Sequence, residues 1–146
     1  MTPRGVLHRL LRYLAGRGPR PGGSRGVGED WERVAEKALE ADGYRILARN
    51  FRTRVGELDF VAEEDGVLCF VEVKGRGGAG FGLPADSVTG EKQRRIHRAA
   101  EAYLVRRPRR GPCRFDVVTI LETKEERRVE ILRDAFQGPP RRRRRR

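Results

Sequence analysis

The segment GELDFVAEEDGVLCFVEVK, residues 56–74, decides the fold because it has the pattern of two strands joined by a tight turn. Residues 55–62 and 67–74 are rich in the β-branched, aromatic and other apolar side chains that favour strands. Asp65-Gly66, between the two runs, is the dipeptide typical of short hairpins. The second run is the most apolar of the chain, so we expect it to be a central strand of a sheet.

Helical periodicity predicts one helix before this hairpin, over residues 29–41, and one after it, over residues 87–106. In both segments, apolar residues recur at the spacing i, i+3, i+4, i+7 and i+8: Trp31, Val34, Ala35, Ala38 and Leu39, then Ile96, Ala99, Ala100, Tyr103 and Leu104. Further strands are predicted over residues 44–51, 115–121 and 129–132. The order α-β-β-β-α-β-β predicts an α/β fold in which helices pack on a mixed sheet.

The net charge of +12 comes from the two ends of the 146-residue chain. Residues 1–25 hold six arginines and no acid, and residues 141–146 are all arginine, whereas the segment between them is formally neutral. We therefore expect a basic, flexible leader over residues 1–25, one folded domain over 26–136, and a disordered poly-arginine tail over 137–146. Such tails raise affinity for nucleic acids through phosphate contacts without adding sequence specificity, but they also occur as simple solvated tails.

The sequence contains no run of apolar residues long enough to span a membrane. Its two cysteines, Cys69 and Cys113, form no disulfide framework, and a reducing cytoplasm is the expected location. Val6 to Leu14 is apolar but interrupted by basic residues, so it is a poor secretory signal. A short amphipathic helix docked on a membrane surface or a partner is an alternative for this segment.

Asp59, Glu72 and Lys74 are the candidate catalytic residues. Successive side chains of a strand point to opposite faces, so Glu72 and Lys74 share one face. Charged groups are rarely buried in apolar strands unless they are paired or bound to a metal. Asp59 and Glu72 are therefore the expected ligands of Mg²⁺ (or Mn²⁺), with the carbonyl of Val73 as a third, and Lys74 would orient or activate a water molecule or stabilise developing charge. This set is typical of a metal-dependent nuclease.

Three cations near these residues are expected to contact nucleic acid: Lys92 and Arg95 on the second helix, and Arg76 in the glycine-rich stretch after Lys74. That stretch formally matches GxGxxG from Gly75 to Gly80, but no helix follows at once, which argues against a dinucleotide site. An ordinary solvated helix face is the alternative interpretation of the basic residues.

Three segments, GELDFVAEEDGVLCFVEVKGR, FGLPADSVTGEKQRRIHRAAEAYL and RFDVVTI, resemble the YraN family of small bacterial proteins. These proteins are predicted endonucleases, distantly related to archaeal Holliday junction resolvases. The resemblance runs from about Glu32 to Phe136. It implies a restriction-endonuclease-like fold of the PD-(D/E)xK class, with Asp59, Glu72 and Lys74 as its core motif.

The resemblance also implies a catalytic glutamate on the first helix, within a Gly-Glu-x-x-Ala pattern. Glu32 has the correct spacing to Ala35, although Trp31 replaces the glycine. Glu29 follows a glycine but stands three residues too early, so Glu32 is preferred and Glu29 is held in reserve. The proline that leads the motif of this class is absent, since Leu58 precedes Asp59.

The expected function is that of a Mg²⁺-dependent endonuclease that hydrolyses phosphodiester bonds in DNA rather than RNA, including branched or otherwise structured DNA. Related resolvases act as dimers, so a homodimer is open, although no dimer face is identified in the sequence. The alternative is a catalytically weak or inactive nucleic-acid-binding protein on the same fold, in which the basic tails dominate binding.

Overall fold

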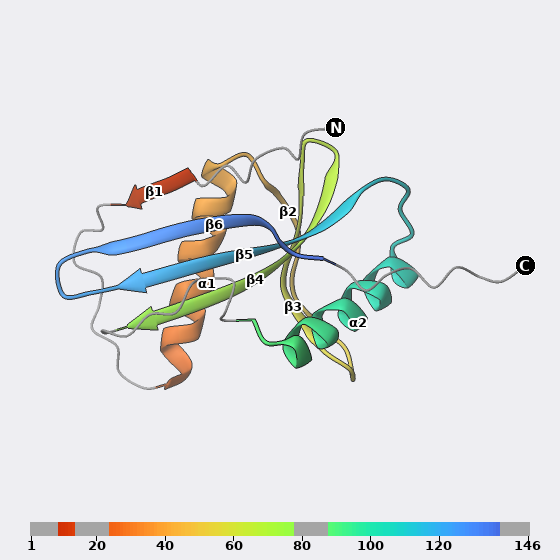
Figure 1. Ribbon diagram of the computed structural model, residues 1–146, viewed down its shortest axis with the longest axis horizontal. Helices are drawn as coiled ribbons and strands as arrows, with labels where there is room; N and C mark the ends of the chain where they lie inside the picture. Colours follow the sequence, from red (N-terminus) through yellow and green to blue (C-terminus); the bar gives the residue numbers. More distant parts are fainter. Residues whose placement is uncertain (1–8, 14–23, 78–87, 138–146) are drawn as a thin grey trace, which may run out of the picture.

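The computed structural model describes residues 9–13, 24–77 and 88–137, and among these it describes the side chains of residues 31–75 and 88–137. In chain order the elements are β1 (Arg9–Tyr13), α1 (Ser24–Ala41), β2 (Arg45–Arg52), β3 (Glu57–Glu64), β4 (Val67–Gly77), α2 (Gly90–Arg106), β5 (Cys113–Glu122) and β6 (Arg127–Phe136). The strands form one six-stranded sheet in the order β1-β6-β5-β4-β3-β2, as Figure 1 shows.

The sheet is mixed because one pair of neighbouring strands is parallel. β4 and β5 run parallel from Leu68↔Cys113 to Gly77↔Glu122, and the other neighbours are antiparallel. Parallel neighbours need a long crossover, which α2 provides between β4 and β5. The predicted α/β class, the mixed sheet with helices against it, and the central place of β4 are therefore confirmed.

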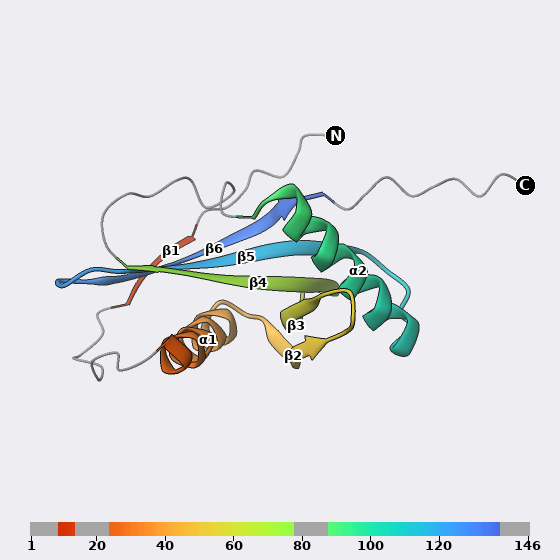
Figure 2. The same ribbon diagram turned by 90° about the horizontal axis from the view of Figure 1, so that it is seen from below.

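The two helices pack against opposite faces of the sheet and create two cores (Figure 2). The core under α1 contains Ala35, Leu39 and Tyr44 together with odd-numbered residues of β4 such as Cys69 and Val71. The core under α2 contains, among others, Leu68, Phe70, Ile96, Ala99, Ala100, Tyr103 and Val117. Because side chains alternate along β4, Glu72 and Lys74 belong to the α2 face.

Several elements differ from the predicted ranges. β1 lies within the segment for which a flexible leader was expected, and it pairs antiparallel with β6 at the edge of the sheet. β6 has ten residues rather than the predicted four, because its pairing with β5 extends to Glu122↔Arg127. α2 begins at Gly90 rather than Ser87, since Thr89 caps it by accepting a hydrogen bond from the backbone nitrogen of Lys92 at 3.3 Å. The predicted tail over 137–146 lies, apart from Gln137, outside the described residues.

The sheet forks next to Asp59, and this fork is what positions the candidate site. The ladder between β3 and β4 ends at Phe60↔Val71. Beyond that pair, β4 continues beside β5, whereas β3 continues beside β2 through Phe51↔Leu58 and Arg52↔Glu57. The divergence of β3 from β4 leaves room for side chains between two strands that are otherwise hydrogen-bonded neighbours.

Candidate active site

Asp59 lies at the fork, and its carboxylate bonds to the backbone of β4 where the ladder has ended. Its Oδ2 accepts a hydrogen bond from the backbone nitrogen of Val73 at 2.8 Å. The amide of Val73 is thereby satisfied although no strand partner from β3 reaches it. This bond fixes the Asp59 side chain beside the two β4 residues on either side of Val73, which are Glu72 and Lys74.

Glu72 is the carboxylate that faces Asp59. It is 7% exposed, and its side chain is close enough to Asp59 for a hydrogen bond between the two carboxyl groups. Burial, with the neighbouring charge of Glu72 as the second cause, raises the pKa of Asp59 from its ordinary 3.8 to about 8, although the Val73 hydrogen bond acts in the opposite direction. Two carboxylates that are buried in contact repel each other, so a cation bound between them would stabilise the pair.

Two lysines complete the polar cluster. Lys92, from the first turn of α2, places its Nζ 2.8 Å from Oε1 of Glu72. Lys74 lies beside Lys92, and burial together with that neighbouring ammonium lowers the pKa of Lys74 below its ordinary value. The structure thus brings Asp59, Glu72, Lys74 and Lys92 together at one place on the α2 side of β4.

Glu32, on α1, lies at the border of this cluster. Its Oε2 accepts a hydrogen bond from Nδ2 of Asn50 at 3.2 Å, and its charge contributes to the raised pKa of Asp59. The side chain of Glu29 is outside the described residues, so the choice between the two glutamates is still a prediction. Glu36, one turn further along, pairs instead with Arg49 of β2.

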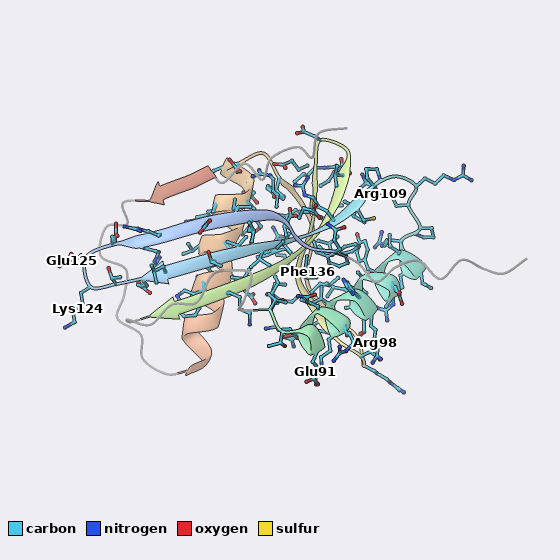
Figure 3. The ribbon with its side chains drawn as sticks, in the orientation of Figure 1. Glu91, Arg98, Arg109, Lys124, Glu125 and Phe136 are labelled. Atoms are coloured by element: carbon cyan, nitrogen blue, oxygen red, sulfur yellow. The ribbon has the colours of Figure 1, made fainter. Side chains whose placement is uncertain are left out.

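Of the predicted nucleic-acid contacts whose side chains the structure describes, Lys92 reaches the cluster and Arg95 does not. Arg95 is exposed and pairs with Glu91 at 3.0 Å, and the side chain of Arg76 is outside the described residues. Glu91 and Arg98 lie on the side of α2 that faces away from the sheet (Figure 3). The sequence pointed to Lys92 as a phosphate contact but contained no local signal of its pairing with Glu72, since that depends on how α2 is rotated against β4.

Asp59 and Glu72 are the two carboxylates of the cluster that could hold a divalent cation. Within the part of the chain that the structure describes, no group of three or more His, Cys, Asp and Glu side chains is placed to hold a metal ion. Mg²⁺ usually takes one or two protein carboxylates and keeps several waters, so the pair is sufficient for it.

A second acidic cluster lies on the α1 face of the sheet, where Asp116 of β5 is the register partner of Val71, and its carboxylates are paired with arginines. Asp116 is completely buried, and it accepts hydrogen bonds from the hydroxyl of Tyr44 at 2.7 Å and from Nε of Arg114 at 2.9 Å. Glu64 accepts from Arg114 at 2.7 Å and from Arg133 at 2.6 Å. This network has its own arginine counter-ions and is the pattern of a structural cluster.

A sequence profile of the family described as Uncharacterised protein family UPF0102 matches residues 31–120, which include every charged residue of the candidate cluster. The chain belongs to UPF0102. This is the family that the sequence resembles under the name YraN, so that part of the resemblance is confirmed. The family description itself states no activity.

Curated UPF0102 relatives match along most of their length. A UPF0102 protein of Symbiobacterium thermophilum is 49% identical over 117 residues, which are 79% of this chain and 99% of the relative. One from Lachnoclostridium phytofermentans is 49% identical over 109 residues, 73% of this chain and 89% of the relative, and one from Myxococcus xanthus is 42% identical over 119 residues, 81% and 94%. Neither helix of the described part is long and apolar enough to cross a membrane.

Proposed function

We propose that this UPF0102 protein is a metal-dependent endonuclease that hydrolyses phosphodiester bonds in DNA, with the restriction-endonuclease-like PD-(D/E)xK arrangement. The observation that carries the proposal is the meeting of Asp59 and Glu72 at the fork of the sheet, with Lys74 beside them. A structural cluster would pair its buried carboxylates with arginines, as Asp116 and Glu64 do on the α1 face. The raised pKa of Asp59 indicates that its negative charge lacks such compensation.

Asp59 and Glu72 would hold Mg²⁺ or Mn²⁺, and the carbonyl of Val73 is the proposed third ligand. The metal would supply positive charge at the scissile phosphate and a more acidic bound water. The Val73 amide holds the Asp59 carboxylate in one orientation, so that one ligand is positioned before the metal arrives. Glu72 is fixed by its place in a central strand.

Lys74 is the proposed group for the attacking water and for the charge that develops on the phosphate. Its pKa is lowered by burial and by Lys92, so its ammonium gives up a proton more readily than that of an exposed lysine. As a cation it stabilises negative charge, and as a neutral amine it accepts a proton from water. Glu32, whose charge also acts on Asp59, is proposed to interact with the water molecules around the metal.

Arg95, which is exposed on α2 three residues after Lys92, is the proposed phosphate contact outside the cluster. Arg76 is proposed with it because Arg76 follows Lys74 in β4 by two positions. A cytoplasmic location and a homodimer are further proposals, which the cleavage experiment does not need.

The test is cleavage of supercoiled plasmid, linear duplex, four-way junction, single-stranded DNA and RNA by the full chain, with Mg²⁺, with Mn²⁺ and with EDTA. We expect metal-dependent cutting that Asp59→Asn abolishes and that Lys74→Met reduces by about 10²-fold or more. Asp65→Asn makes the same aspartate-to-asparagine replacement in the exposed turn between β3 and β4, away from the cluster, and should leave the rate unchanged. A folded protein that cuts none of these substrates with either metal contradicts the proposal.

The second candidate is a binding protein without turnover, and the excess of arginine at both chain ends favours it. It predicts tight, strongly salt-dependent binding that is lost when residues 141–146 are removed. The leader is not removed in this experiment because it contains β1, and its deletion would expose the edge of β6. If the truncated chain binds as tightly as the full chain, this candidate is wrong.

A further inference from the structure

Lys92 of α2 is turned toward the sheet and contacts Glu72. Arg94, Arg95 and Arg98 of the same helix are exposed, whereas the side chain of Lys92 is 39% exposed and that of Glu72 is 8% exposed. The Thr89 cap bonds to the backbone nitrogen of Lys92 itself, so the helix start fixes the backbone from which this side chain extends toward Glu72.

The oxygen that Lys92 occupies is one that a metal would need. Nζ of Lys92 is 2.8 Å from Oε1 of Glu72, and Glu72 is the carboxylate that faces Asp59. A divalent cation shared by the two carboxylates and an ammonium group on one of them would be like charges a few ångströms apart in a poorly solvated place. Such charges repel much more strongly than they would in bulk water.

Lys74 makes the pair between Lys92 and Glu72 easier to break. Its side chain is within hydrogen-bond reach of Lys92, so two lysines crowd one edge of the same carboxylate pair. A single lysine would have compensated Glu72 without that repulsion. The second ammonium group therefore lowers the cost of separating Lys92 from Glu72.

We propose that Lys92 is a positioning residue that serves as the internal counter-ion of Glu72 in the metal-free protein, competes with the divalent metal for that carboxylate, and contacts a phosphate of the nucleic acid once released. This rests on the metal site proposed above. The exchange involves no covalent change: Glu72 loses an ammonium partner and gains a metal, and the ammonium becomes available to the substrate anion. Metal and substrate binding are thereby coupled, because each favours the released position of Lys92.

The test measures the Kd for Mn²⁺ alone by isothermal titration on the full-length protein, for wild type, Lys92→Gln and Lys92→Arg. We expect Lys92→Gln to bind Mn²⁺ about ten-fold more tightly, because a buried carboxylate has lost its competing partner. Lys92→Arg keeps the charge and should stay near the wild-type Kd. Arg98→Gln removes one positive charge from the exposed face of the same helix and is the matched control, with an unchanged Kd.

The second measurement is affinity for a DNA duplex in Ca²⁺, which supports binding without requiring turnover. Lys92→Gln should bind duplex DNA more weakly than wild type although it holds metal more tightly, and a purely structural role for Lys92 would not move the two affinities in opposite directions. Circular dichroism checks that the variants are folded, and Lys92→Met replaces Lys92→Gln if the amide variant is not.

An equal or weaker affinity of Lys92→Gln for Mn²⁺ overturns the proposal, as does an equal tightening in Arg98→Gln. If the folded wild type binds no Mn²⁺, the proposed metal site is wrong, and the proposed role of Lys92 is wrong as well. If the wild type binds Mn²⁺ and Lys92→Gln binds it more tightly, but no substrate is cut, the counter-ion role stands and the endonuclease proposal is the one that fails.

Discussion

Asp59→Asn should make the metal-free protein more stable at neutral pH, although it removes the central residue of the proposed site. In the folded state the pKa of Asp59 is raised from 3.8 to about 8, so the folded protein holds a proton that the unfolded chain has already released. The free energy of unfolding therefore falls as pH rises between about 4 and about 8. Over the roughly three pH units up to pH 7, at about 1.4 kcal/mol each, the cost reaches about 4 kcal/mol.

Asparagine fits the site without this cost. Its side-chain oxygen can accept the hydrogen bond from the Val73 amide that Asp59 Oδ2 accepts at 2.8 Å, and its NH₂ group can donate to Glu72. We expect a gain of about 2–4 kcal/mol at pH 7, the lower figure allowing for partial solvation, which is about 10 °C in Tm for a domain of this size. At pH 4 the gain should nearly vanish, because this pH is close to the ordinary pKa of 3.8, and the unfolded chain then holds the Asp59 proton in a large fraction of molecules.

The assay is thermal unfolding by circular dichroism in EDTA from pH 4 to pH 8, with Asp65→Asn as the control for a lost surface charge. Saturating Mn²⁺ should raise the Tm of the wild type and leave that of Asp59→Asn almost unchanged, since binding to the folded state alone stabilises it. A variant that is less stable than wild type at pH 7, or whose gain is the same at pH 4 and pH 7, would refute the reasoning.

Two further substitutions test the packing around the site and the paired cluster. Gly56→Ala should destabilise the protein by about 1–3 kcal/mol in urea unfolding, because a Cβ at that position would lie 2.3 Å from the carbonyl oxygen of Arg95, whereas Gly90→Ala meets nothing closer than 3.7 Å and should be nearly neutral. Tyr44→Phe should cost about 1–3 kcal/mol at pH 7 because it removes a buried hydroxyl from Asp116, and a loss below about 0.5 kcal/mol would show that the network tolerates the gap.

The strands that carry the site could be predicted because their signal is local. The apolar run before Glu72 and the Asp65-Gly66 turn require no knowledge of distant residues, and strand alternation puts Glu72 and Lys74 on one face. The position of Asp59 beside them depends on the bond to Val73, fourteen residues away, and on β3 leaving β4 at that point. Periodicity contains no information about where two paired strands separate.

The elements and contacts that the sequence did not predict depend on pairing between residues that are far apart in the chain. β1 exists through its register with β6, from Arg9↔Ile131 to Tyr13↔Arg127, across more than a hundred residues of sequence. Charged side chains dominate both ends of β6, so only its centre has a recognisable strand pattern, and the ladder with β5 defines the rest. In the same way, the sequence does not distinguish Lys92 from Arg95, and only the rotation of α2 against β4 makes one a half-buried counter-ion of Glu72 and the other an exposed arginine.

The two acidic clusters of the sheet differ in how their carboxylate charges are balanced, and this difference distinguishes a structural cluster from a functional one. Although burial opposes it, hydrogen bonds from Arg133 and Arg114 hold the pKa of Glu64 below its ordinary value, so that cluster stabilises the fold as it stands. Asp59 is held in the opposite condition, with a raised pKa and another carboxylate as its neighbour. A fold that pairs one buried acidic cluster with arginines and leaves Asp59 of the other with a raised pKa beside a second carboxylate bears a cost in stability there. Such a cost is expected where a ligand relieves it, and a divalent cation suits two carboxylate oxygens at a fork between strands.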